Sequence, residues 1–313
     1  AGLRGERYDG FTVASRVVLL PAVGASIVRR VGDATWKARL AYGSGMRPAR
    51  TPMRETAWRG ADAGAVTSDL LPEKQAGIEA GVDFFWRRNL SLQVTRFDQR
   101  ASSLIQQVPT YADASLPDAM PPADTLSGRC CGSRPPRFGY ALENLGVITN
   151  RGWEMTLRQS MGAFSIAGTL SLVQSRVEQV AAGYAGDLRA GDRMLEVPAR
   201  TTGVVLTWTP RRWQFQLGGT QVADWINYDR LALAGTYLRG GTPARALTGA
   251  TLRTYWASYG EVTRLRFAAS HDLTRAVTLR LLGENLLDRQ RGEPDNVTIV
   301  PGRTLSFGLS ARF

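Results

Sequence analysis

The last ten residues of the chain alternate strictly between apolar and other side chains. Leu305, Phe307, Leu309, Ala311 and Phe313 take every second position, with polar residues, an arginine or glycine between them. Successive side chains of a β-strand point to opposite faces of the sheet, so this segment predicts a strand with one wholly apolar face. The same alternation recurs along the chain, at the lengths and spacing that a transmembrane β-barrel requires.

The other alternating segments predict an all-β chain. They cover 36–42, 78–86, 90–94, 153–157, 164–172, 204–208, 213–217, 264–270 and 277–281, with weaker candidates at 3–8 and 22–29. No amphipathic helical pattern competes with them. We therefore expect an antiparallel transmembrane β-barrel structure with about 12 strands in this chain.

The links between these segments alternate in length. Short links fall at 30–34, 87–89, 159–162, 209–212 and 271–275, and long ones at about 44–72, 98–143, 178–196, 223–258 and 284–303. Outer-membrane barrels have short periplasmic turns at one rim and longer extracellular loops at the other. A soluble sandwich rarely contains so many loops beyond about 12–15 residues. The pattern therefore favours an outer-membrane barrel.

The alternation also predicts which side chains face the barrel interior. The charged residues expected there are Lys37, Arg39, Glu79, Asp83, Glu154, Arg158, Arg266 and Arg280. An arginine or lysine turned toward the lipid midplane would cost about 2–4 kcal/mol, which fixes the register of these strands. Aromatic residues gather near strand ends, at 84–86 and at Trp208 and Trp213, as expected of an interfacial girdle.

Composition excludes several other classes of protein. No stretch of about 18 apolar residues occurs, so we expect no transmembrane helix. The net charge of +12 comes almost entirely from arginines that are spread over loops and polar strand faces, and we expect no nucleic-acid partner. Cys130 and Cys131 are adjacent, so a disulfide between them would be strained. The single histidine, His271, has no partner at a metal-site spacing, and we expect neither a metal nor a cofactor.

Three groups of motifs resemble the carboxyl-terminal barrel portion of TonB-dependent outer-membrane receptors. The first is GENLLD at 283–288 with PGRT at 301–304 and the terminal Phe313; the second is NLG at 144–146 with NRGWE at 150–154; the third is LPE at 71–73 with Gly77, Glu79 and Gly81. Their asparagines, glycines and prolines are turn residues at the borders of strands, where positive φ angles and bulges are common. They carry no chemistry of their own.

The resemblance implies a larger protein. Members of the family have a 22-stranded barrel, a plug domain inside it and a segment that contacts TonB. No plug-like region precedes the strands here, so we expect residues 1–313 to be a partial barrel domain, its carboxyl-terminal portion. The implied function is TonB-coupled uptake of a scarce ligand, such as a ferric siderophore, cobalamin or an oligosaccharide, across a Gram-negative outer membrane. The implied partners are the TonB complex, contacted through the missing plug region, and outer-membrane lipid and lipopolysaccharide.

Two alternative functions remain open at this point. A self-contained smaller barrel could form a porin-like channel, because an even strand number and matched loop lengths permit it. An outer-membrane enzyme would need a nucleophile, a base and an orienting group within reach of one another. His271 beside Asp272 is the only pair of that kind, and no nucleophile elbow or phosphate loop accompanies it. We therefore expect no enzymatic activity.

Candidate ligand-binding residues lie in two long loops. Arg47, Arg50 and Arg54, with Arg59 nearby, could attract an anionic chelate or lipopolysaccharide. Trp225, Tyr228 and Trp256 lie in or beside a later loop, and could stack on a ligand or anchor at the lipid interface.

Overall fold

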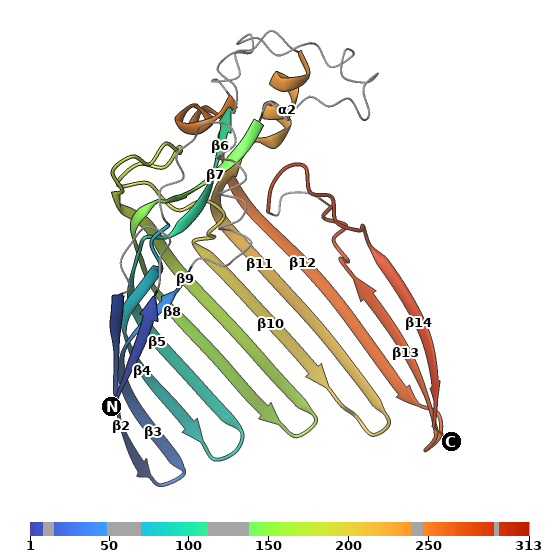
Figure 1. The fold of residues 1–313 in the computed structure, drawn as a ribbon. Coiled ribbons are helices and arrows are strands. Elements are labelled where there is room, and N and C mark those ends of the chain that lie inside the picture. Colours follow the sequence, from blue (N-terminus) through green and yellow to red (C-terminus); the bar gives the residue numbers. More distant parts are fainter. Residues whose placement is uncertain (9–15, 49–69, 112–137, 240–246, 291–293, 313) are drawn as a thin grey trace.

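Twelve antiparallel strands form one curved sheet in the computed structural model (Figure 1). The structure describes residues 1–8, 16–48, 70–111, 138–239, 247–290 and 294–312. The strands of the sheet, in spatial order, are β1 (Gly2–Tyr8), β2 (Arg16–Val31), β3 (Ala34–Arg47), β4 (Glu73–Trp86), β5 (Leu90–Ser102), β8 (Gly146–Met161), β9 (Phe164–Val180), β10 (Arg200–Trp208), β11 (Trp213–Tyr228), β12 (Trp256–Asp272), β13 (Val277–Glu284) and β14 (Thr304–Ala311). The predicted fold class and the count of about 12 strands are confirmed.

The sheet is an open wall, with β1 and β14 at its two edges and the two termini beside them (Figure 1). Each strand pairs with its neighbour in the chain, except that β5 pairs with β8 across an inserted hairpin. None of the helices in the described residues is long and apolar enough to span a membrane.

Short and long links alternate as predicted. Tight turns at 32–33, 87–89, 162–163, 209–212 and 273–276 line one rim, and the strand ends that border links 48–72, 103–145, 181–199, 229–255 and 285–303 form the other rim (Figure 1). Gly32 and Gly162 occupy their turns with φ of 58°, a conformation that glycine adopts without steric cost.

The long links contain secondary structure that alternation did not predict. Link 103–145 holds a hairpin of β6 (Ile105–Tyr111) and β7 (Phe138–Asn144), and link 229–255 holds helix α2 (Arg230–Arg239) and the 3-10 helix η4 (Gly249–Tyr255). Helix α2 buries no residue, so it has no apolar stripe to reveal it in the sequence. It begins at a capping residue instead, because the backbone N–H of Ala232 donates to Asp229 Oδ1 at 2.8 Å.

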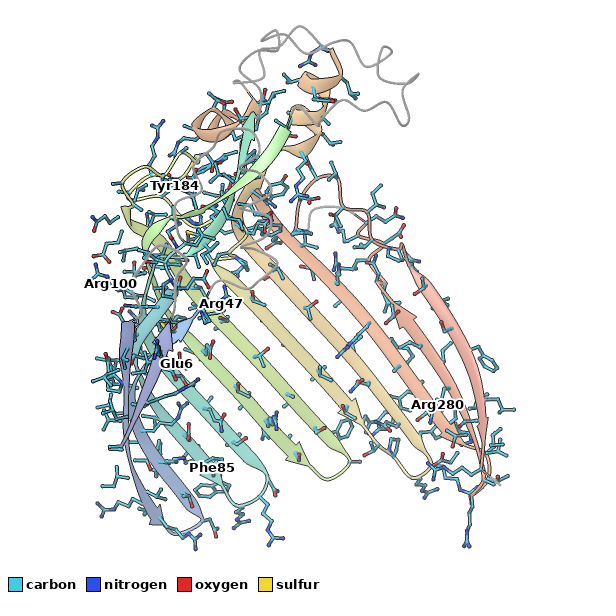
Figure 2. The ribbon with its side chains drawn as sticks, viewed as in Figure 1. Glu6, Arg47, Phe85, Arg100, Tyr184 and Arg280 are labelled. Atoms are coloured by element: carbon cyan, nitrogen blue, oxygen red, sulfur yellow. The ribbon has the colours of Figure 1, made fainter. Side chains whose placement is uncertain are left out.

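The two faces of the sheet differ as predicted. Cross-strand pairing places all eight charged residues expected inside on one face, from Lys37 opposite Asp83 to Arg280 opposite Ser270. Figure 2 shows Arg47, which shares that face, pointing into the hollow of the wall, whereas Arg100 projects from the convex side. The convex face carries exposed apolar side chains, among them Ile78, Val82, Leu206 and Leu217.

Glycines on the concave face make room for arginines. A Cβ at Gly81 would lie 2.7 Å from the guanidinium of Arg39, which crosses that glycine to pair with Asp83 at 3.3 Å. A Cβ at Gly218 would likewise lie 2.7 Å from Nε of Arg266. Arg39 and Arg266 therefore lie close against the wall.

Aromatic rings line the convex face beside the tight turns. Phe164 stacks on Trp208, Trp208 on Phe215, and Phe215 on Trp213, with ring centroids 5.3 to 5.5 Å apart. His271 completes the row by stacking on Trp213 at 4.0 Å. The predicted gathering of aromatic residues at strand ends is confirmed, and the single histidine is part of it.

The most buried apolar cluster lies where the sheet meets the long links. Leu145, Ile148, Val177 and Leu188 form it, with side chains from links 103–145 and 181–199 packed around them. These two long links are therefore built on a small hydrophobic core that they share with the upper ends of β8 and β9.

Candidate functional site

The bases of two long links are fixed by asparagine side chains. Asn144, from the NLG motif, accepts from the N–H of Leu71 at 2.8 Å and donates to the carbonyl oxygens of Leu71 and Ser103 at 3.0 and 2.7 Å. Leu71 belongs to the LPE motif, so these two distant motifs meet directly. Gly146, the last residue of the NLG motif, has a φ of 127°, and a Cβ there would lie 2.3 Å from the carbonyl oxygen of Gln179. The motif is a structural tie, as its turn residues indicated.

The GENLLD and PGRT motifs meet in the same way. Asn285 donates to the carbonyl oxygens of Arg289 and Pro301 at 3.0 and 2.9 Å. Asp288 accepts from the N–H of Arg303 at 2.9 Å, and this bond, with a second one from Gln290, lowers the pKa of the Asp288 carboxyl. The base of link 285–303 is therefore closed by side-chain bonds between its two ends.

Links 181–199, 229–255 and 285–303, called here the loop cluster, are joined through buried carboxylates. Asp187 is 4% exposed and accepts from the hydroxyl of Tyr228 at 2.6 Å and from the indole N–H of Trp256 at 2.7 Å. Hydrogen bonds to a charged acceptor are shorter and stronger than neutral ones. Asp187 thus ties link 181–199 to the strands that flank link 229–255.

Arg253 makes a second connection between the same two links. Its guanidinium holds the carboxylate of Asp192 with two hydrogen bonds, one of them 2.7 Å long, and donates to the carbonyl oxygen of Asp187 at 3.3 Å. It also lies 4.4 Å above the ring of Trp256. Burial acts to raise the pKa of Asp192, but the hydrogen bonds from Arg253 and from the backbone N–H of Arg189, together with the charges of these two arginines, outweigh it and the pKa is lowered. The pair is charged at neutral pH.

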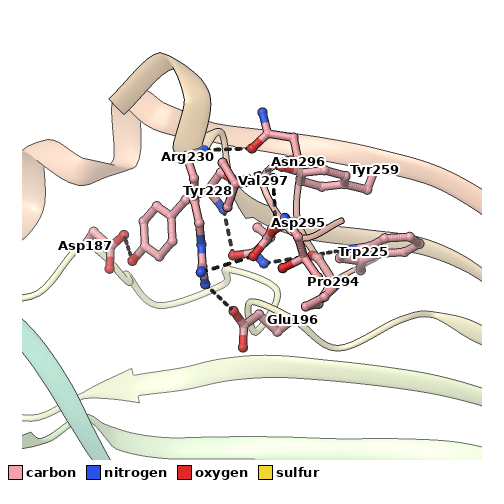
Figure 3. Close-up of polar contacts among 12 residues, drawn as sticks. Asp187, Glu196, Trp225, Tyr228, Arg230, Tyr259, Pro294, Asp295, Asn296 and Val297 are labelled. Carbon is pink, nitrogen blue, oxygen red and sulfur yellow. Dashed lines mark hydrogen bonds and ion pairs between the residues drawn. The ribbon is translucent and has the colours of Figure 1, made fainter. Parts of the chain in front are cut away.

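Link 285–303 joins the cluster through Asp295, which is 1% exposed (Figure 3). Asp295 accepts from the backbone N–H groups of Val297 and Thr298 at 3.0 and 2.6 Å, and pairs with Arg230 at 3.1 Å. Burial acts to raise the pKa of Asp295, but these bonds and the charge of Arg230 outweigh it and the pKa is lowered. Arg230 reaches on to Glu196 at 3.4 Å, so one arginine contacts both neighbouring links.

The carbonyl oxygen of Pro294 is the second point at which this link is fixed. It accepts from the indole N–H of Trp225 at 3.0 Å and from the side-chain amide of Asn227 at 2.9 Å (Figure 3). Trp225 is 2% exposed and stacks on Tyr259, whose hydroxyl donates to the carbonyl oxygen of Tyr228 at 2.8 Å. Strands β11 and β12 therefore hold link 285–303 from below.

The structure brings together three of the six predicted ligand-binding residues. Trp225, Tyr228 and Trp256 lie at the ends of β11 and β12 that border the loop cluster, where their polar atoms bond to its links. Arg47 lies elsewhere, at the end of β3, where it pairs with Glu73. Arg50 and Arg54 fall outside the described residues, as do Arg59, Cys130 and Cys131.

Sequence reasoning missed the residues that organise this site. Asp187, Asp192, Arg230, Arg253 and Asp295 are single charged residues in links, without a repeat or a spacing that would mark them. Their partners lie far away in sequence, so only folding brings them together. The aromatic residues were a usable signal, because buried tyrosine and tryptophan need a partner for their polar atom.

The chemistry available in the loop cluster is hydrogen bonding and charge pairing. Across the ranges that the structure describes, no group of three or more His, Cys, Asp or Glu side chains could hold a metal ion. What the arrangement does is hold three links in one fixed relation above the concave face of the sheet.

Comparison with known proteins identifies the family. The model of the TonB dependent receptor-like, beta-barrel family matches residues 1–286. No curated protein matches the sequence.

Solved structures with the same fold include three receptors or transporters. The pyoverdine receptor FpvA of Pseudomonas aeruginosa PAO1, bound to pyoverdine, is 12% identical with a TM-score of 0.60, and the match covers 96% of this chain and 37% of FpvA. The copper transporter OprC is 14% identical with a TM-score of 0.59, covering 96% of this chain and 40% of OprC. The ferric-catecholate import receptor Fiu of Escherichia coli K12 is 12% identical with a TM-score of 0.57, covering 96% of this chain and 35% of Fiu.

The chain thus spans well under half the length of these proteins, and at such identities the likeness shows the fold. The family match over most of the chain shows more. TonB-dependent receptor barrels are transport proteins of the Gram-negative outer membrane, not enzymes. This chain belongs to the TonB-dependent receptor β-barrel family.

Proposed function

We propose that residues 1–313 form the carboxyl-terminal portion of a receptor barrel that takes up a scarce ligand across the outer membrane with energy from TonB. The family supports transport, and the partial coverage of FpvA and OprC supports a larger complete barrel with a plug. The partner for energy coupling would be the TonB complex, reached through the plug.

The observation that carries this proposal is the loop cluster above an open, polar concave face. A capture surface needs loops whose shape is set before the ligand arrives, because loops ordered only on binding lose affinity to the entropy of ordering. Here carboxylates that are 4% and 1% exposed join three links into one unit. A simple diffusion channel does not need such a unit.

Ferric siderophores are the ligand class that we propose first. FpvA is solved with pyoverdine and Fiu is named as a ferric-catecholate import receptor, whereas OprC is named as a copper transporter. Cobalamin and oligosaccharides are the other classes that the family suggests. Arg47, Arg50 and Arg54 would attract an anionic chelate, while Trp225, Tyr228 and Trp256 would position the loops around it.

Uptake of radioactive iron tests the proposal. Cells that lack their own siderophore receptors would express the protein and receive catecholate, hydroxamate or mixed ferric siderophores, with and without TonB. We expect uptake of at least one chelate that disappears in cells without TonB. Equal uptake without TonB, together with discrete conductance of the purified protein in a bilayer, would instead establish the porin-like channel.

A further inference from the structure

The convex face changes from apolar to charged at the same height on three neighbouring strands. Read from the tight turn upward, the outward residues of β8 are Met161, Gln159, Leu157, Met155, Trp153 and Arg151. All of them up to Trp153 are apolar except Gln159, and Arg151 is charged. Cross-strand pairing puts Trp153 between Leu172 of β9 and Arg96 of β5. Both of those strands are apolar below this level and polar or charged above it. The change marks the upper limit of the surface that suits hydrocarbon.

Four arginines, called here the arginine patch, occupy the convex face at and just above this limit. They are Arg96 and Arg100 of β5, Arg151 of β8 and Arg176 of β9. Arg100 and Arg176 lie opposite the same residue of β8, Thr149, so they are two strand spacings apart, about 10 Å. Figure 2 shows Arg100 projecting away from the sheet on its convex side.

The arginine patch has more cations than carboxylates. Arg151 pairs with Asp98 at 2.9 Å and Arg100 with Glu178 at 3.2 Å. The side chains of these pairs are 46 to 59% exposed, and such exposed pairs contribute little to stability, so their arginines can exchange partners.

The other two arginines use carbonyl oxygens. Arg176 donates to the carbonyl oxygen of Gly191 at 3.1 Å, and Arg96 to that of Gly152 at 2.9 Å while lying 5.6 Å from the ring of Trp153. Within the described ranges, neither of them pairs with a carboxylate. Their charge is left for an anion outside the chain.

We propose that the arginine patch binds the phosphorylated headgroup of a lipid in the outer leaflet. Guanidinium groups hold phosphate oxygens with paired hydrogen bonds, and basic residues next to a membrane surface attract anionic headgroups. The patch is continuous with the apolar wall below it, so a lipid can place its chains against Trp153 and Leu172 and its phosphate among the arginines. A soluble phosphate would use only the upper half of this surface.

The experiment measures lipid retained by the purified protein. The protein would be expressed in the outer membrane, extracted in mild detergent and incubated with lipopolysaccharide, with enzymatically dephosphorylated lipopolysaccharide or with inorganic phosphate, and bound molecules would be counted by native mass spectrometry. The variant R100Q/R151Q/R176Q removes three charges of the patch. The matched control R158Q/R266Q/R280Q removes three charges from the concave face.

We expect the patch variant to bind phosphorylated lipid at least about tenfold more weakly, since each arginine near a charged surface contributes roughly fivefold. The control should bind like the unmodified protein, and removal of the lipid phosphates should weaken binding as the patch variant does. Equal binding by patch variant and unmodified protein, or equal binding of dephosphorylated lipid, would overturn the proposal. So would inorganic phosphate that displaces the lipid at equal concentration.

A second variant separates binding from folding. R100K/R151K/R176K keeps the charges and loses the paired donors, and should bind with intermediate strength. Heat-dependent mobility on a gel reports whether each variant is folded. If the glutamine variant does not fold, the lysine variant decides the question, because unreduced binding by a folded lysine variant contradicts paired-donor recognition.

This inference rests on the proposed function only for its location in the outer membrane. Lipid retention is measured without ligand and without TonB. Loss of TonB-dependent uptake with lipid binding intact would reject the transport proposal alone, and the reverse result would reject the arginine patch alone.

Discussion

Replacement of Asp187 by alanine should open the loop cluster without unfolding the sheet. The substitution leaves the hydroxyl of Tyr228 and the indole N–H of Trp256 without their acceptor, which they now reach at 2.6 and 2.7 Å. A hydrogen bond to a charged group contributes about 1.5–3 kcal/mol, so two lost bonds give an upper bound of about 3–6 kcal/mol. Both donors are only partly buried and can rehydrate, and removal of a buried charge offsets part of the loss, so we expect about 2–4 kcal/mol.

Hydrogen exchange measures this change residue by residue. A loss of about 2–4 kcal/mol in local opening free energy corresponds to roughly 30- to 1000-fold faster exchange. It should appear at the backbone amides of Gly191 and Met194, which donate to carbonyl oxygens of β9 at 2.8 and 3.0 Å. The amides of β10, in the middle of the sheet, should keep their protection.

A matched control lies in the same link. Glu196→Gln removes a carboxylate that pairs with Arg230, and the Glu196 side chain is 53% exposed. Because exposed ion pairs contribute little to stability, amide exchange should become faster by no more than about fivefold. If Asp187→Ala changed exchange as little as the control does, the loops would not depend on the buried carboxylate. The reasoning behind the loop cluster would then be wrong.

Three further predictions concern the strands, a link base and pH. Gly152→Ala places a Cβ 2.2 Å from a carbonyl oxygen of the neighbouring strand, and should lower the free energy of unfolding measured in urea by about 1–3 kcal/mol. In the control Gly168→Ala the nearest carbonyl oxygen is 3.9 Å from the Cβ, so the free energy of unfolding should change little. Equal effects of the two substitutions would reject the steric argument. Asn285→Ala removes the hydrogen bonds that close link 285–303, and proteolysis of that link in the folded barrel should become faster. An unchanged rate of cleavage would contradict this prediction. Folding lowers the pKa values of Asp192 and Asp295 below the ordinary value of about 3.9. Their charges therefore stabilise the loop cluster fully above about pH 3.9, and this stabilisation is lost as the pH falls through the lowered pKa values. Exchange protection in the links should therefore be constant from about pH 8 to 5 and fall below about pH 4 before the sheet unfolds; loss of protection near pH 6 would point to other groups.

The sheet could be predicted from the sequence because it follows from one local rule. Alternation placed Lys37 and Asp83 on one face and Ile78 and Val82 on the other, and pairing in the structure agrees. The length of each strand could not be predicted as well, since β11 and β12 extend beyond their alternating segments to Tyr228 and Trp256. There the strands are held by links rather than by lipid, so their side chains need not alternate.

The loop cluster could be predicted only in part. The aromatic residues at 225, 228 and 256 stood out, but their acceptors, Asp187 and the carbonyl oxygen of Pro294, are separated from them by dozens of positions. Helix α2 was missed because it buries no residue and so shows no apolar stripe, although Asp229 caps its first turn. Contacts of this kind depend on how the links meet, which no local pattern records.

The asparagine ties at the feet of the links have a consequence for engineering. Because Asn144 and Asn285 fasten the two ends of their links to backbone atoms, each of these links starts and ends at feet whose spacing is fixed. A foreign epitope inserted between Gln290 and Pro294, which keeps both feet and the contacts of Pro294 and Asp295, should therefore reach the cell surface in a correctly assembled barrel. The same ties give evolution a means of rewriting the tips while the scaffold stays unchanged.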